Sequence, residues 1–189
     1  MPAKPVPFAA SLDPSVLRAI TWVREYTDST LAASAASTLA AIPVTSVKGT
    51  TQVTENAGTL TNITGLSFSL VANRMCHFKF MGSFRSAATT TGIGLSFTGP
   101  AVTYAFWSAQ IEQGAVGTDQ MFTYSVANQL NYIGSSASVV AANTDYLWVV
   151  EGFVQPSAAG TLQLQFRSEV AGSTVTLNAG SVGVLTSCG

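Results

Sequence analysis

The scarcity of charged side chains constrains this chain more than any other feature of its sequence. Asp, Glu, Lys and Arg make up 9% of its 189 residues, whereas about 25% is usual in globular proteins. Hydrophobic residues account for 47%, and the mean hydropathy is +0.35. Since a water-soluble monomer needs a charged surface, we expect much of this surface to be buried against neighbouring subunits. The composition therefore favours a component of a large assembly over a free enzyme.

Several other classes are excluded by the distribution of charge and proline. The net charge is −1 and the basic residues are scattered, so the chain has no electrostatic footprint for nucleic acid and no polybasic run for anionic lipid. The uncharged stretches 29–47 and 86–111 are rich in Ser, Thr and Gly and contain Pro43 and Pro100. Neither is apolar enough to span a membrane.

The N-terminus and the cysteines indicate an intracellular origin. The first apolar stretch is interrupted by Pro5 and Pro7, whereas the apolar region of a secretory signal is longer and unbroken. The two cysteines, Cys76 and Cys188, do not form a disulfide framework, and we expect two free thiols. This expectation fits a cytosolic origin.

Residues 1–43 are expected to form an attachment segment. The prolines in residues 1–12 predict an extended arm, and Asp13-Pro14 is typical of a helix start, because Asp caps the first N–H groups and Pro fits the first helical position. Apolar residues then recur at helical spacing to about Thr27, which predicts an amphipathic helix. The Ala- and Ser-rich residues 29–42 either continue this helix or act as a linker, and Pro43 ends them.

This segment holds too little apolar surface to fold alone, so we expect it to dock on another protein. The apolar face of the predicted helix supplies the candidate attachment residues: Val16, Ile20, Trp22 and Val23.

From residue 44 the pattern changes to that of a β-sandwich. Thr, Val, Phe, Tyr and Gly dominate, and apolar residues alternate with polar ones, as in Phe78, Phe80 and Phe84. Gly-, Pro- and Asn-containing turn signals separate the candidate strands. These strands lie at 66–71, 77–84, 94–98, 102–111, 121–126, 131–133, 138–141, 146–154, 162–167 and 174–178. Eight to ten short strands predict an antiparallel sandwich or barrel, with residues 44–189 as a jelly-roll-like oligomerisation domain.

Catalytic residue patterns are missing from the sequence. His77 is the single histidine, and its neighbour Cys76 points to the opposite face of a strand, so the two are poorly placed to share a metal. Glu151 and Glu169 could meet as a glycosidase pair, but isolated polar positions or ion pairs between subunits are the favoured interpretation. No nucleophile elbow, P-loop, dinucleotide fingerprint or Cys-x-x-Cys pair occurs. We therefore expect no enzyme activity, no cofactor and no metal.

Aromatic residues gather at two places, around Trp107 and between residues 146 and 153. Such groups in strands usually belong to a core or an interface. The alternative is a shallow carbohydrate-binding shelf, or a receptor-binding loop near Trp107 or Tyr132.

The C-terminal part of the chain resembles a segment of tailed-bacteriophage virion proteins. The resemblance covers residues 145–186 and consists of an aromatic strand with Glu151-Gly152, a small-Gly-Thr turn at 158–161, a Leu/Gln/Phe strand at 162–166, and Ala-Gly-Ser at 179–181. Proteins of this kind are similar to trimeric jelly rolls of the C1q/tumour-necrosis-factor type. They serve as head decoration (cement) proteins, head fibres or tail-fibre tips.

This resemblance implies a virion structural protein without catalytic residues. It also implies a homotrimer whose final strands line the three-fold axis, for which the candidate interface residues are Tyr146, Trp148, Phe153, Leu164 and Phe166. The partners expected are further copies of the chain and other virion proteins, either the major capsid protein or neck and tail proteins. Head decoration is the first expectation. The alternative is a tail, neck or head-fibre protein that binds a host receptor or surface glycan.

Overall fold

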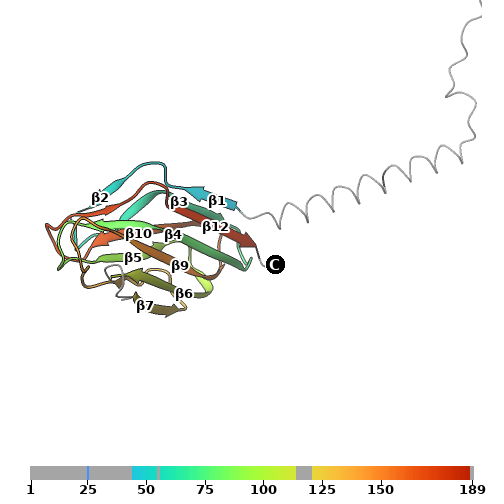
Figure 1. Cartoon of the computed structure of the whole chain (residues 1–189). Coiled ribbons are helices and arrows are strands. Elements are labelled where there is room, and N and C mark those ends of the chain that lie inside the picture. Colours follow the sequence, from blue (N-terminus) through green and yellow to red (C-terminus); the bar gives the residue numbers. More distant parts are fainter. Residues whose placement is uncertain (1–24, 26–43, 55, 114–120, 188–189) are drawn as a thin grey trace, which may run out of the picture. The chain divides into compact units, whose positions relative to one another are not determined.

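A computed structural model describes residue 25 and residues 44–54, 56–113 and 121–187. The chain divides into two units, residues 1–42 and 43–189, and the second contains every strand described here (Figure 1). The first strands are β1 (Val44–Val47), β2 (Gln52–Thr54), β3 (Thr61–Leu70), β4 (Cys76–Ser86), β5 (Ile93–Thr98) and β6 (Val102–Glu112). They are followed by β7 (Met121–Ala127), β8 (Gly134–Ser135), β9 (Asp145–Pro156), β10 (Gly160–Ser168), β11 (Val175–Leu177) and β12 (Val182–Ser187).

These strands form two antiparallel sheets. The larger has eight strands in the order β1-β12-β4-β9-β6-β7, with β11 pairing with both β4 and β2. The smaller has four strands in the order β3-β10-β5-β8. From β3 to β10 each strand passes to the other layer except β6 and β7, which pair within the larger sheet. As a result β4-β9-β6-β7 faces β3-β10-β5-β8, which is the arrangement of a jelly roll. The prediction of a mainly β, antiparallel, jelly-roll-like body is confirmed.

The core lies between the inner faces of the two sheets and is rich in aromatic rings. Phe97 of the smaller sheet makes edge-on contacts with Phe78 and Trp107 of the larger one, with ring centroids 5.1 Å apart in both cases. Phe68 of the smaller sheet and Phe80 of the larger one also bridge the layers, with tilted rings whose centroids are 5.1 Å apart. All of these side chains are buried. The alternation seen in the sequence therefore places Phe78, Phe80 and Phe84 on the inner face, as expected.

Two of the expected strands are wrong. Residues 131–133 and 138–141 run as loops, and the two-residue strand β8 lies between them. Val139 shows the physical reason: it is apolar, β-branched and buried like a strand residue, but its N–H makes a single bond to the carbonyl of Thr89. An apolar sequence pattern indicates which residues are buried, whereas a β-strand also needs a row of backbone hydrogen bonds to a neighbouring strand. Strands β1 and β2 were not expected, whereas β12 follows Ala-Gly-Ser at 179–181, where the resemblance implies a last strand.

The expected arm (1–12) and the helix from Asp13 to about Thr27 fall outside the described residues, apart from Glu25. The structure therefore gives the predicted helix no support, and the assignment of residues 1–43 to attachment stays a prediction. Among the described residues, no helix has the length and hydropathy to cross a membrane.

Candidate subunit interface

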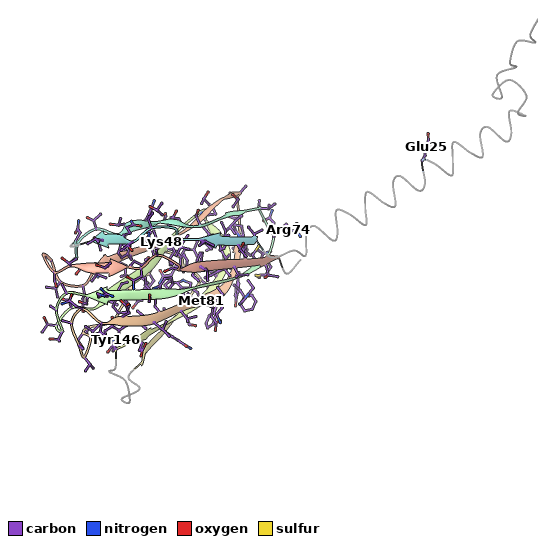
Figure 2. The ribbon with its side chains drawn as sticks, turned by 45° about the horizontal axis from the view of Figure 1, so that its top comes forward. Glu25, Lys48, Arg74, Met81 and Tyr146 are labelled. Atoms are coloured by element: carbon purple, nitrogen blue, oxygen red, sulfur yellow. The ribbon has the colours of Figure 1, made fainter. Side chains whose placement is uncertain are left out.

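The outer face of the eight-stranded sheet carries an unusual number of exposed apolar side chains. Strand β9 shows how this arises: Tyr146, Trp148 and Val150 point into the core, while Leu147 and Phe153 on the alternate positions point outward. In Figure 2 the strands of this sheet cross the front of the molecule, with Met81 labelled on β4. Six large apolar residues on β1, β4, β9 and β6 are 39–65% exposed, and we call them the apolar face: Val47, Met81, Tyr104, Phe106, Leu147 and Phe153.

The exposed area of the apolar face can be estimated from these fractions. A large apolar side chain presents about 200 Å² when it is free, so six side chains that are about half exposed leave roughly 600 Å² of apolar surface in water. This area equals the upper end of what the largest patch on a typical monomer shows, about 300–600 Å². The largest patch on a monomer often has a function, and contiguous patches larger than this mark interaction sites.

One end of the apolar face is aromatic. Phe153 of β9 lies directly opposite Phe106 of β6 in the strand register, and Tyr104 follows on the same side of β6. On the other side of β9, His77 of β4 is the register partner of Phe153, and the two rings are 5.0 Å apart. We call Tyr104, Phe106 and Phe153 the aromatic cluster.

The centre of the apolar face is occupied by an ion pair between strands β4 and β9. Lys79 of β4 and Glu151 of β9 are register partners, and their Nζ and Oε2 atoms are 3.4 Å apart. Both side chains are partly exposed, so the pair stabilises a single copy by no more than about 1 kcal/mol. Its consequence for binding is that a partner can cover this row without meeting an unpaired charge.

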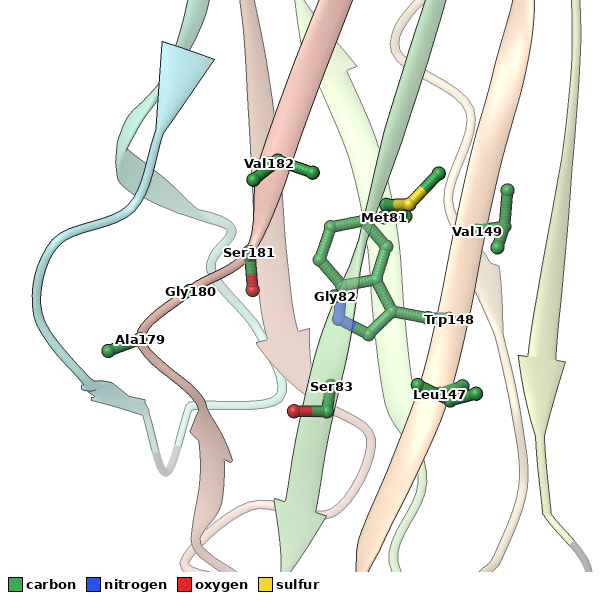
Figure 3. Close-up of a pocket in the computed structure, with 10 residues that line it drawn as sticks. All are labelled: Met81, Gly82, Ser83, Leu147, Trp148, Val149, Ala179, Gly180, Ser181 and Val182. Atoms are coloured by element: carbon green, nitrogen blue, oxygen red, sulfur yellow. The ribbon is translucent and has the colours of Figure 1, made fainter.

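The other end of the face contains a hollow of about 360 Å³. Figure 3 shows its lining from three directions: β4 beneath, β9 on one side, and the loop between β11 and β12 on the other. Met81, Leu147, Val149 and Val182 supply apolar walls, and none of the lining residues is charged. The hollow is therefore suited to an uncharged, apolar group.

The loop that forms one wall of the hollow is held by hydrogen bonds. Asn178 donates from Nδ2 to Ser83 Oγ (2.9 Å) and to Asp145 Oδ1 (3.0 Å). Arg85 donates to both oxygens of the same carboxylate, from Nε at 2.9 Å and from Nη2 at 3.0 Å. These bonds from Arg85 and then Asn178 hold the pKa of Asp145 below its usual value, and the same pairing raises the pKa of Arg85.

The segment after β1 holds the same loop from the opposite side. The backbone N–H of Lys48 donates to the carbonyl of Ser181, and that of Gly180 donates to the carbonyl of Lys48, both at 2.8 Å. The Lys48 side chain is buried and donates from Nζ to Gln52 Oε1 at 3.1 Å. Burial lowers the pKa of this ammonium. The loop that forms this wall is thus held by hydrogen bonds on both sides within a single copy.

Four of the five candidate interface residues lie in the core of a single copy. Tyr146, Trp148, Leu164 and Phe166 are at most 1% exposed. A side chain that has no surface in one copy has none to lose to a neighbour, so these four assignments are corrected to the core. Phe153 remains on the surface, as part of the apolar face. The candidate attachment residues Val16, Ile20, Trp22 and Val23 lie outside the described residues.

The other candidate residues are dispersed. Trp107 is fully buried and donates from Nε1 to the carbonyl of Gln129 at 2.9 Å, so it cannot form a carbohydrate shelf, whereas Tyr132 is exposed. Glu151 lies on the eight-stranded sheet and Glu169 follows β10 of the other sheet, so the two carboxylates belong to different layers. Among the described residues, no three His, Cys, Asp or Glu side chains gather as a metal site.

Sequence reasoning missed Val47, Met81, Leu147 and the hollow. The available signal was the run 146–154, in which residues of both parities are apolar. A strand that is apolar on both faces is usually covered on both faces. This pattern therefore indicates that the odd-numbered residues of β9, including Leu147 and Phe153, are the candidates for an interface.

Comparison with known proteins gives only distant likenesses. No family model and no curated protein match the chain. Among solved structures, it is similar to TmCBM61 in complex with β-1,4-galactotriose, with 8% identity and a TM-score of 0.36 over 67% of this chain and 86% of that one. It is also similar to chains in structures of the infectious bursal disease virus Gx strain (11% identity, TM-score 0.24) and its VP2 subviral particle (13%, 0.23). Each of those likenesses covers 77% of this chain but 40% of the viral chain. Such low scores leave the function to be argued from the chain itself.

Proposed function

We propose that this chain is a structural subunit of a bacteriophage virion that forms homotrimers through the apolar face. The first 43 residues attach the trimer to another virion protein, and the capsid surface is the first expected location. The role requires binding alone and involves no catalysis or cofactor.

The apolar face is the observation that carries this proposal. Interfaces between identical subunits are about 65% apolar in their area, so roughly 600 Å² of apolar surface corresponds to an interface of about 900 Å² on each copy. Stable complexes bury about 800 Å² per partner. Each copy in a trimer has two neighbours, so a face of this size is divided between two contacts and supplies about 450 Å² to each.

Two features of the sequence support the same role. With 9% charged residues, the chain has few of the charges that keep a free monomer soluble. The segment 145–186 resembles virion proteins that are built as trimeric jelly rolls, and it includes all of β9, which supplies Leu147 and Phe153 to the face. A trimer rather than a dimer is proposed because of that resemblance.

The experiment has two readouts, mass and attachment. The purified full-length chain should have three times its subunit mass of 19.6 kDa in light scattering, and it should bind to virions from which this subunit has been removed. A chain lacking residues 1–43 should remain trimeric and lose binding. A full-length chain that stays a monomer at micromolar concentration would refute self-association, and binding without residues 1–43 would refute the attachment role. Electron microscopy of the bound virions then distinguishes head decoration from a position on the neck, tail or head fibre.

A further inference from the structure

The apolar face has two unlike ends. The aromatic cluster stands at one end and the hollow at the other, and strand β9 connects them. Phe153 belongs to the cluster, while Leu147 and Val149 line the hollow. Four to six residues of extended strand separate these positions, which corresponds to about 13–20 Å. A copy therefore cannot place its own aromatic cluster in its own hollow.

The two ends are chemically complementary. The hollow is walled by aliphatic side chains and by the thioether of Met81, and sulfur makes favourable contacts with the edges of aromatic rings. The cluster presents three rings without a formal charge. Phe106 and Phe153 are each 44% exposed, so each has a large ring surface available for burial. The Lys79–Glu151 pair lies between the two ends, so neither contact has to bury an unpaired charge.

We infer that the aromatic cluster of one copy occupies the hollow of the next copy. This inference rests on the proposed self-association and specifies how it occurs. A contact between two unlike patches is either isologous, as in a two-fold dimer, or heterologous, and heterologous contacts produce a closed ring when the rotation between neighbours closes. In a ring of three copies, each copy gives one aromatic cluster and receives another.

The hydrogen bonds around the hollow fit this role. Asn178, which is bonded to Ser83 and Asp145, and Lys48, which is bonded to Ser181 and Gly180, hold the loop wall in place. A pocket formed in advance loses little conformational entropy when it is filled, so more of the apolar burial appears as affinity.

The test uses two full-length variants, each of which loses one half of the contact. The double variant F106S/F153S removes most of the aromatic cluster, and V182W fills the hollow from β12, where the side chain of Val182 points toward Met81 (Figure 3). Their controls are V170S, at a residue that is 43% exposed outside the face, and A171W, at an exposed alanine outside the hollow. Circular dichroism and thermal unfolding establish that each variant is folded.

Each contact variant alone should associate at least about 30-fold more weakly than the natural chain, while both controls remain oligomeric. A mixture of the two variants should form a heterodimer, because the V182W chain still has its cluster and the F106S/F153S chain still has its hollow. Light scattering then gives a mass of two subunits for the mixture.

Three outcomes would overturn the inference. The first is undiminished association of either contact variant. The second is a mixture that remains monomeric while the natural chain is oligomeric, which leaves self-association standing and removes this mode of contact. The third is a natural chain that is itself a monomer, which refutes the proposed function and the inference together.

Discussion

Replacement of Leu147 with Ser measures the contribution of the apolar face directly. Leu147 is the most exposed of the six side chains, at 65%, and it stands at the rim of the hollow. Complete burial of a leucine side chain stabilises by about 1.5–3 kcal/mol. Burial of the exposed two thirds is therefore worth about 1–2 kcal/mol at each contact between copies, and its loss weakens each contact by a factor of about 5–30.

Sedimentation equilibrium over a range of concentrations provides the assay. The association constant of L147S should fall while its free energy of unfolding, measured at a concentration where both proteins are monomeric, changes by less than about 0.5 kcal/mol. The matched control is V71S, because Val71 is 58% exposed and lies in the turn after β3, outside the face. Equal losses of association in L147S and V71S, or no loss in L147S, would refute the interface.

Two further predictions concern the sheet that carries the face. Since pairing with Arg85 lowers the pKa of Asp145, the pair stabilises the fold fully above the ordinary carboxyl pKa of about 3.9, and this contribution is lost as the pH falls through the lower folded value. Urea unfolding should show D145N less stable by under about 1 kcal/mol at pH 7, because both groups are exposed, with no difference in strong acid. The free energy of unfolding of G152A should be lower by about 1–3 kcal/mol in the same assay, since an added Cβ would lie 2.6 Å from Trp107 Cα. G49A, where a Cβ meets nothing within 4 Å, should be nearly neutral, and equal effects of the two glycine variants would contradict the packing argument.

The body of the fold could be predicted because its signals are local. The alternation of Phe78, Phe80 and Phe84 places three aromatic rings on one face of β4, and the period of two requires no knowledge of the partner strand. The pairing of β1 with β12, and of β11 with both β2 and β4, joins segments that are far apart in the chain. Short strands of this kind acquire their conformation from tertiary partners, so the sequence shows little sign of them.

The candidate interface could be predicted only in part, for a related reason. Tyr146 and Phe153 are both aromatic residues of the same strand, yet one is buried and the other is exposed. Because side chains alternate along a strand, an even-numbered and an odd-numbered residue lie on opposite faces of the sheet. The neighbouring sequence does not indicate which of these faces packs against the second sheet. The sequence-based assignment grouped aromatic residues without regard to the face of the sheet on which they lie. It therefore placed Tyr146 and Trp148 at the interface, whereas both belong to the core. The hollow depends on the loop 178–181 and on its bonds to Ser83 and Asp145, which are contacts between distant segments.

The same two-sided character of β9 connects the composition of the chain to its proposed role. An ordinary sandwich strand has one apolar face and one solvated face, and the solvated positions are where charged residues normally lie. On the outer side of β9, Leu147, Val149 and Phe153 occupy such positions, and Glu151 is already paired with Lys79 of β4. Charges placed here without partners would have to be desolvated on association, at a cost of several kcal/mol for each ion. Under the proposed self-association, the scarcity of charge and the apolar face follow from one requirement, that this sheet be covered on both sides.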